Sequence, residues 1–117
     1  MKVFGLLIAT LILAASSFAQ TSHSVALTWT APTGGSSVTG YNPYRGTTKG
    51  GPYTVLGTTP VAGTSYTDTS GLVEGTTYFY VVTSVGPGGE SVSSNEASAL
   101  IPVSKPLPPS NLTSTPK

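Results

Sequence analysis

Residues 72–82 read LVEGTTYFYVV, and the second half of this stretch has the regular alternation of a β-strand. Tyr78, Tyr80 and Val82 would lie on one face of that strand, and the residues between them on the other. The side chains are aromatic or β-branched, which are the types that strands favour. The pattern therefore predicts a strand over residues 76–85, the longest of the protein.

Five shorter segments of the same kind surround this strand, and turns rich in Gly and Pro separate them. In the first of them, apolar and small polar side chains alternate up to Trp29, the only tryptophan. Several short strands with frequent turns predict an all-β sandwich or barrel. The five segments are HSVALTWTAP (23–32), VTGYNPYRG (38–46), GGPYTVLGTT (50–59), TSYTDTSG (64–71) and SNEASALI (94–101).

The composition indicates one small domain without a cofactor. A chain of 117 residues has the usual length of a single domain. Its formal charge is +1 and only 8% of its residues are charged, so it lacks the basic surface expected for nucleic-acid or membrane binding. It has no cysteine and one histidine, and its four acidic residues are dispersed, so we expect no disulfide, no metal site and no cofactor.

The first nineteen residues have the pattern of a signal peptide. Lys2 precedes an apolar run over residues 3–15, and small side chains at Ser17 and Ala19 suit cleavage before Gln20. The run is shorter than the roughly 20 apolar residues of a spanning helix, although a retained membrane anchor is the alternative interpretation. We therefore expect residues 1–19 to be removed and the mature chain to be secreted, extracellular or periplasmic, with no membrane contact.

Three motifs resemble those of a fibronectin type III domain of the bacterial secreted type, from about Ser24 to Ile101. Trp29 lies on what would be strand B, whereas antibody domains carry their tryptophan on strand C. The stretch 72–82 is similar to the family's corner between strands E and F, where a tyrosine at position 78 can bind the backbone upstream. GYNPYRGT and SNEASA resemble strands C and G. The resemblance implies an immunoglobulin-like antiparallel sandwich of two sheets.

The same resemblance predicts which side chains fill the core. Five aromatic residues would supply most of the buried area, since each buries roughly 150–250 Å². The expected core consists of Trp29, Tyr41, Tyr66, Tyr78, Tyr80, Val25, Leu27, Val55, Leu72, Val82, Ala97, Ala99 and Ile101.

Two features depart from the family pattern. Pro43 would point inward on strand C, a central strand in which proline removes one ladder N–H group. Strand A is weak or missing, because cleavage after Ala19 leaves only QTSHS before strand B. Strand B would then lie at the edge of its sheet with unpaired backbone groups.

The end of the chain looks like the start of a domain. We expect the folded domain over residues 20–103 and a Pro-rich tail or linker over 104–117, in which PPSNLTST resembles a strand A. The simpler interpretation is a linker leading to a further repeat. In the alternative, residues 106–117 associate with a second copy, with Leu112 as the inward anchor of a donated strand.

No constellation in the sequence is typical of an enzyme. Serine is abundant, but His23 is the only histidine and no GxSxG motif occurs. Glu90 and Glu96 lie on a turn and the next expected strand, where two solvated side chains are the simpler interpretation. We therefore expect no catalytic residues and no enzymatic activity.

A candidate binding face remains on the outer side of strands C and F. Its members would be Tyr44, Phe79 and Val81, with Tyr53 nearby, and few charges surround them. Such an aromatic patch can contact a protein or polysaccharide partner. The alternative is ordinary cross-strand pairing that stabilises the sheet.

These observations favour a secreted, non-catalytic fibronectin type III module that acts as a spacer, adhesion or carbohydrate-associated binding domain. Two alternatives stay open at this point. One is a self-assembling structural subunit that uses its tail as a donor strand, and the other is a fragment of a longer multi-repeat extracellular protein.

Overall fold

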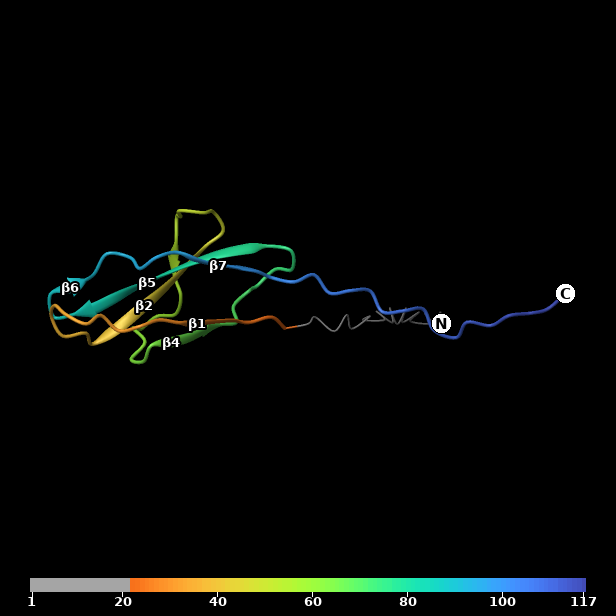
Figure 1. Cartoon of the computed structure of the whole chain (residues 1–117), viewed down its shortest axis with the longest axis horizontal. Coiled ribbons are helices and arrows are strands. Elements are labelled where there is room, and N and C mark those ends of the chain that lie inside the picture. Colours follow the sequence, from red (N-terminus) through yellow and green to blue (C-terminus); the bar gives the residue numbers. More distant parts are fainter. Residues whose placement is uncertain (1–21) are drawn as a thin grey trace, which may run out of the picture.

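The computed structural model describes residues 22–117, and in this range the chain forms seven β-strands and no helix (Figure 1). The predicted signal peptide lies outside the described residues. Within them, no helix is long and apolar enough to cross a membrane. The strands are β1 (Val25–Thr28), β2 (Gly40–Gly46), β3 (Thr54–Val55), β4 (Ser65–Asp68), β5 (Thr77–Gly86), β6 (Gly89–Glu90) and β7 (Ala97–Leu100).

The strands form two antiparallel sheets, which confirms the predicted all-β sandwich. One sheet consists of β1 and β4, and the other has β5 at its centre between β2 and the pair β6 and β7, with β3 beyond β2. Each of the six segments predicted as strands contains one. Residues 89–90, which the sequence predicted as part of a turn, form β6 instead.

Serine side chains complete the pairing along β5 between β6 and β7. The hydroxyl of Ser91 accepts a hydrogen bond from the N–H of Ser84, and that of Ser94 accepts one from the N–H of Val82, both at 2.9 Å. The backbone N–H groups of Ser91 and Ser94 donate in return to the same two residues at 2.8 Å. The segment between the two short strands is therefore fixed against the sheet although it is not itself a strand.

The core between the sheets contains most of the predicted residues. Leu56, Tyr78, Tyr80 and Ile101 form its buried centre. Val25, Leu27, Tyr66, Leu72 and Ala99 pack against it as partly buried residues, while Tyr41 is buried beside the ring of Trp29 at a centroid distance of 5.4 Å.

The prediction was wrong at Val55 and Ala97, which are exposed. Val55 on the two-residue strand β3 pairs with Tyr44 on β2, and β3 ends there. Leu56 then donates its N–H to the carbonyl of Pro43 at 2.8 Å and is the buried residue of this segment. In so short a strand, the alternation does not extend far enough to show which side chain faces the core.

The corner before β5 is closed as predicted. The hydroxyl of Tyr78 accepts a hydrogen bond from the N–H of Val73 at 3.0 Å and donates one to the carbonyl of Gly71 at 3.4 Å. Gly75 adopts a φ of +77°, a conformation that side chains with a Cβ disfavour, and its N–H donates to the carbonyl of Ile101 at 2.8 Å. The corner is thus held both to β5 and to the residue that follows β7.

Pro43 is buried on β2 without distorting the strand. The register between β2 and β5 runs without a break from Gly40 opposite Val85 to Gly46 opposite Phe79, so no bulge forms. The Pro43 carbonyl faces Leu56, and in an antiparallel strand the nitrogen of a residue faces the same side as its carbonyl. The nitrogen of Pro43, which lacks an N–H, therefore faces the end of β3, where the pairing between β2 and β3 ends.

A buried carboxylate joins the two sheets. Asp68 ends β4, and its side chain is 0% exposed. It accepts hydrogen bonds from the Tyr80 hydroxyl on β5 at 2.8 Å, from Arg45 Nη1 on β2 at 2.9 Å, and from the N–H and hydroxyl of Ser70 at 3.1 and 3.0 Å. No pattern in the sequence predicted this network.

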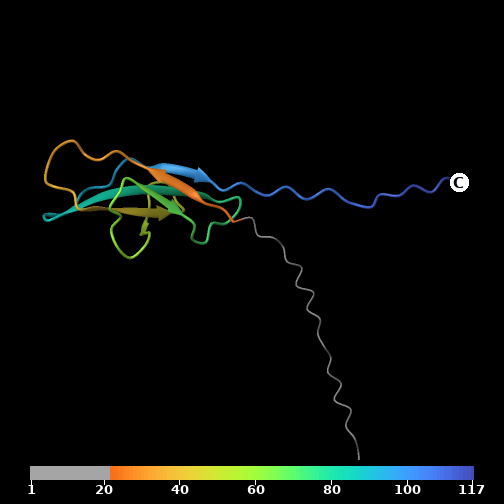
Figure 2. The ribbon, with the colours of Figure 1, turned by 90° about the horizontal axis from the view of Figure 1, so that it is seen from below.

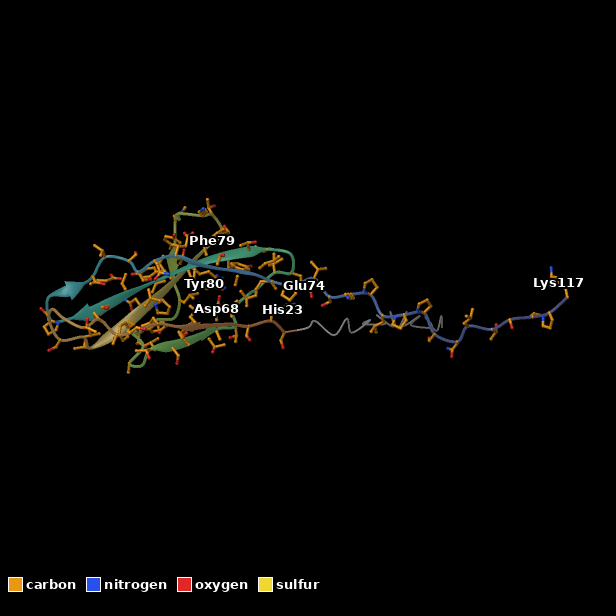
Figure 3. All side chains as sticks on the ribbon, viewed as in Figure 1. His23, Asp68, Glu74, Phe79, Tyr80 and Lys117 are labelled. Carbon is orange, nitrogen blue, oxygen red and sulfur yellow. The ribbon has the colours of Figure 1, made fainter. Side chains whose placement is uncertain are left out.

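The two ends of the described chain leave the sandwich at the same pole. Glu74, in the corner before β5, binds His23 Nε2 at 3.1 Å and accepts a hydrogen bond from the Ser104 hydroxyl at 2.7 Å (Figure 3). The hydrogen bonds from Ser104, followed by that from His23, lower the pKa of Glu74 to about 2. Beyond this contact, the tail extends away from the strands in both views and forms no strand of its own (Figures 1 and 2).

Candidate functional site

Three of the four predicted binding residues lie around one shallow hollow. Tyr44 on β2 and Val81 on β5 are directly opposite each other in the sheet. Tyr53 precedes β3, and the three side chains together line a hollow of about 300 Å³. Phe79, the fourth, lies opposite Gly46 at the next position on the same face and is not part of the hollow's lining.

The four residues differ in how much of their surface a partner could contact. Tyr44, Tyr53 and Phe79 are half-buried, but Val81 is only 5% exposed. Val81 therefore lies on the predicted outer face at the floor of the hollow, where it offers little surface to a partner. Val92, which is largely exposed, forms part of the rim and was not predicted.

Two glutamates hold the tyrosine rings in place. Glu90 on β6 accepts hydrogen bonds from the hydroxyls of Thr83 and Tyr44. Glu96, just before β7, accepts one from the hydroxyl of Tyr53 and one from the N–H of Gly50 at 2.8 Å. Glu90 is exposed and Glu96 is half-buried, but each also has two donors within the domain, which the sequence did not predict.

These contacts fix the protonation states of the site. Hydrogen bonds from Thr83 and then Tyr44 lower the pKa of Glu90, and those from Tyr53 and then Gly50 lower the pKa of Glu96. The same carboxylates raise the pKa of the Tyr44 and Tyr53 hydroxyls. At neutral pH, both glutamates are therefore ionised acceptors and both tyrosines are neutral.

The arrangement is suited to binding through hydrogen bonds and ring contact. Two ionised carboxylates can accept further hydrogen bonds from hydroxyl groups, and the half-exposed rings of Tyr44 and Tyr53 offer flat apolar surface. Neither glutamate has the raised pKa that a general acid needs near neutral pH. In the described part of the chain, no three His, Cys, Asp or Glu side chains lie close enough to hold a metal ion.

Sequence comparison finds relatives among polymer-degrading enzymes. The chain is 46% identical over 82 residues to a poly(3-hydroxybutyrate) depolymerase from Ralstonia pickettii, a match that covers 69% of this chain and 14% of that enzyme. It is 43% identical over 79 residues to exoglucanase B from Cellulomonas fimi, covering 66% of this chain and 6% of that enzyme. The chain thus spans only a small part of these curated relatives.

Structure comparison finds the same fold in two solved proteins. An Fn3-like protein from Clostridium thermocellum superposes with a TM-score of 0.59 and 40% sequence identity, over 74% of this chain and 84% of that one. The twitchin kinase region from C. elegans also has a TM-score of 0.59, at 28% identity, over 69% of this chain and 14% of that one.

The family profile of the fibronectin type III domain matches residues 14–99. The match begins inside the predicted signal peptide and ends on β7. Because it covers most of the chain, and because a solved relative of similar length is 40% identical, the chain belongs to the fibronectin type III domain family.

Proposed function

We propose that this chain is a secreted, non-catalytic accessory module that contacts a polysaccharide through the face around Tyr44. The observation that carries this proposal is its similarity to small parts of two enzymes that are named for different polymers, a polyester and a glucan. Cleaving an ester and cleaving a glycosidic bond need different catalytic groups. A segment that resembles parts of both enzymes is therefore better suited to a non-catalytic accessory role than to catalysis.

The chemistry of the Tyr44 face favours a polysaccharide as the partner. Sugar rings present apolar C–H surface to an aromatic ring and hydroxyl donors to a carboxylate. Tyr44, Tyr53 and Phe79 supply the first kind of contact, and Glu90 and Glu96 supply the second. The hollow is at the small end of the range for ligand sites, so each module would bind weakly.

Secretion is part of the proposal and rests on the signal-like sequence of residues 1–19. We expect exported material to begin at Gln20, since Ser17 and Ala19 have the small side chains that signal peptidase requires. N-terminal sequencing of the culture supernatant and of the membrane fraction measures this. An intact Met1 on a membrane-bound product would contradict it.

The binding role is tested by retention of residues 20–117 on insoluble glucan. We expect the parent to be retained, and Tyr44→Ala and Phe79→Ala each to weaken retention about three- to tenfold, the equivalent of about 1 kcal/mol per ring contact. Poly(3-hydroxybutyrate) granules serve as a second matrix, and retention on these alone would show that a polysaccharide is the wrong class of partner.

Two control variants separate binding from folding. Tyr44→Phe removes the hydrogen bond to Glu90 but keeps the ring, so it should bind more tightly than Tyr44→Ala. Val73→Ala changes an exposed apolar residue in the corner before β5 and should leave retention unchanged. If the parent is not retained, or if both alanine variants on the face bind like the parent, the face only stabilises the sheet and the proposed contact is wrong.

A further inference from the structure

The β1 edge of the smaller sheet is open in the described chain. β1 pairs with β4 on one side, and no strand within residues 22–117 pairs with its other side. Val25, Leu27 and Trp29 are half-buried, whereas Ala26 and Thr28 between them are exposed. An open edge with an apolar inner face is the geometry to which an additional strand binds.

A hollow of about 400 Å³ lies beside this edge. Its lining includes Leu27 on β1 and Trp29 directly after it, Tyr80 on β5, Asn95 just before β7 and Ala97 at its start. Its lining belongs to both sheets, so the hollow is the gap between them along the open edge. A strand added to β1 would place its inward side chains over this gap.

The indole of Trp29 gives a second reason to expect an occupant. Its Nε1 atom is buried, and no acceptor within the described residues binds it. A buried donor without an acceptor destabilises the folded state. An added segment brings backbone carbonyls to the side of the sandwich on which Trp29 lies.

The tail has the properties of such a segment. Leu107 and Leu112 are 90% and 97% exposed, and no strand is formed after β7. Residues 110–114 contain no proline, and their one apolar residue, Leu112, has polar neighbours on both sides. Paired with an edge, this pattern directs Leu112 to one face and its two neighbours to the other.

The positions of the chain ends indicate whether the tail pairs with β1 of its own domain or with β1 of a second copy. The tail leaves at the pole where β1 begins, since His23 and Ser104 both contact Glu74, and β1 runs away from that pole (Figure 1). A tail that folded back onto its own domain would lie parallel to β1. The tail of a second copy stacked end to end enters at the opposite pole and lies antiparallel, the more stable pairing.

We propose that residues 110–114 of one copy add as a strand to the open edge of β1 in the next, with Leu112 in the hollow beside Trp29. Residues 102–110 span at most about 30 Å when extended, enough to join two adjacent poles. The contact is head to tail, so it continues from copy to copy and builds a chain of modules. The proposal assumes cleavage after Ala19, which leaves five residues before Val25.

The tail must change conformation when it binds, which limits the strength of the contact. In the free chain Asn111 has a φ of +59°, a left-handed conformation that asparagine tolerates but that does not fit a strand. Ordering the segment opposes association. Assembly is therefore expected to depend strongly on concentration.

The first experiment measures the mass of residues 20–117 by light scattering over a range of concentrations. We expect the mass to rise with concentration for the parent and for Leu107→Asp, and to remain that of a monomer for Leu112→Asp and for residues 20–105. The two leucine variants carry the same change at equally exposed positions, so only the position of the leucine distinguishes them. A monomeric parent at its solubility limit, or assembly of Leu112→Asp like the parent, would overturn the proposal.

The second experiment identifies the paired segments, and the absence of natural cysteine makes it direct. Ala26 is exposed on β1, and Thr113 would share its face when Leu112 points inward. A mixture of chains carrying Ala26→Cys and chains carrying Thr113→Cys is expected to form interchain disulfides under air oxidation. A mixture of Ala26→Cys with Lys117→Cys serves as the control and should form few.

A chain that carries both Ala26→Cys and Thr113→Cys distinguishes the two directions of the tail. Oxidation within one chain in dilute solution would show that the tail covers its own domain, and would overturn the exchange between copies. The N–H of Trp29 donates to Thr64 beside β4, so the N–H groups of Ala26 and Thr28, at the alternate positions, face the open edge. Protection of these two amides from hydrogen exchange in a monomer that lacks the tail would also overturn the exchange between copies, because the edge would then be covered by residues before β1.

Discussion

Replacing Asp68 by alanine is expected to lower the free energy of unfolding by about 3 kcal/mol, a large part of the stability of a small domain. The carboxylate is 0% exposed and is the common acceptor for groups from β2, β5 and the turn after β4. Its removal leaves the guanidinium of Arg45 and the hydroxyl of Tyr80 without their acceptor between the two sheets. Urea unfolding at pH 7 measures the effect.

The surroundings of Arg45 limit this loss. The guanidinium also donates to the carbonyl of Ser70 at 2.6 Å and lies 4.9 Å from the centre of the Tyr78 ring. Arg45 therefore keeps some of its contacts when the carboxylate is absent. Lys49→Ala, a change at an exposed charged residue, is the control and should alter stability by less than about 0.5 kcal/mol. A similar effect of both changes would show that the buried network contributes nothing.

The pH dependence of stability gives an independent check of the same network. Burial raises the pKa of Asp68, but hydrogen bonds from Tyr80, Ser70 and Arg45 outweigh it and hold that pKa below its usual value. A carboxyl whose pKa is lower in the folded state stabilises the protein above its unfolded pKa of about 3.9 and loses this contribution as the pH falls through its folded pKa.

Asp68→Asn, which cannot ionise, is the matched variant for this experiment. The parent is expected to be more stable than the variant at pH 7, and the difference should shrink below about pH 4. Glu74, Glu90 and Glu96 also have lowered pKa values, but they are present in both proteins and their contributions cancel in the comparison. A difference that is the same at pH 7 and pH 2 would contradict the assignment.

The sequence predicted the features that follow from local alternation. Tyr78, Tyr80 and the corner before them could be placed because the pattern runs through ten residues of one strand. Val55 was predicted in the core in place of Leu56, because β3 has only two residues and so short a run does not show which side chain faces inward. The reliability of the prediction thus follows the length of the strand.

The Asp68 network and the two tyrosine–glutamate pairs could not be predicted in this way. Asp68 lies in a polar segment that is typical of a turn, and its partners Arg45 and Tyr80 are 23 and 12 residues away. Glu90 and Glu96 are 46 and 43 residues from Tyr44 and Tyr53. Such contacts depend on the register between strands, which periodicity along one strand does not determine.

The second large effect on stability is expected at the end of the domain, where two adjacent apolar residues differ in burial. Ile101 is 2% exposed and belongs to the buried centre of the core, whereas Leu100 is 66% exposed. Ile101 follows the last residue of β7, but its backbone is still fixed, because its N–H donates to the carbonyl of Thr76 at 2.9 Å and its carbonyl accepts from Gly75. The larger apolar residue of the final strand is thus on the outside, and the core is closed by the residue after the strand.

We therefore expect Ile101→Ala to lower the free energy of unfolding by about 2–4 kcal/mol, through lost burial and the cavity left in its cluster with Leu56, Tyr78 and Tyr80. Leu100→Ala should change it by less than about 0.5 kcal/mol, since most of that side chain already contacts solvent. Urea unfolding of the two variants and the parent in residues 20–105 avoids any contribution from assembly through the tail. An effect of Ile101→Ala as small as that expected for Leu100→Ala would mean that the core does not extend past β7.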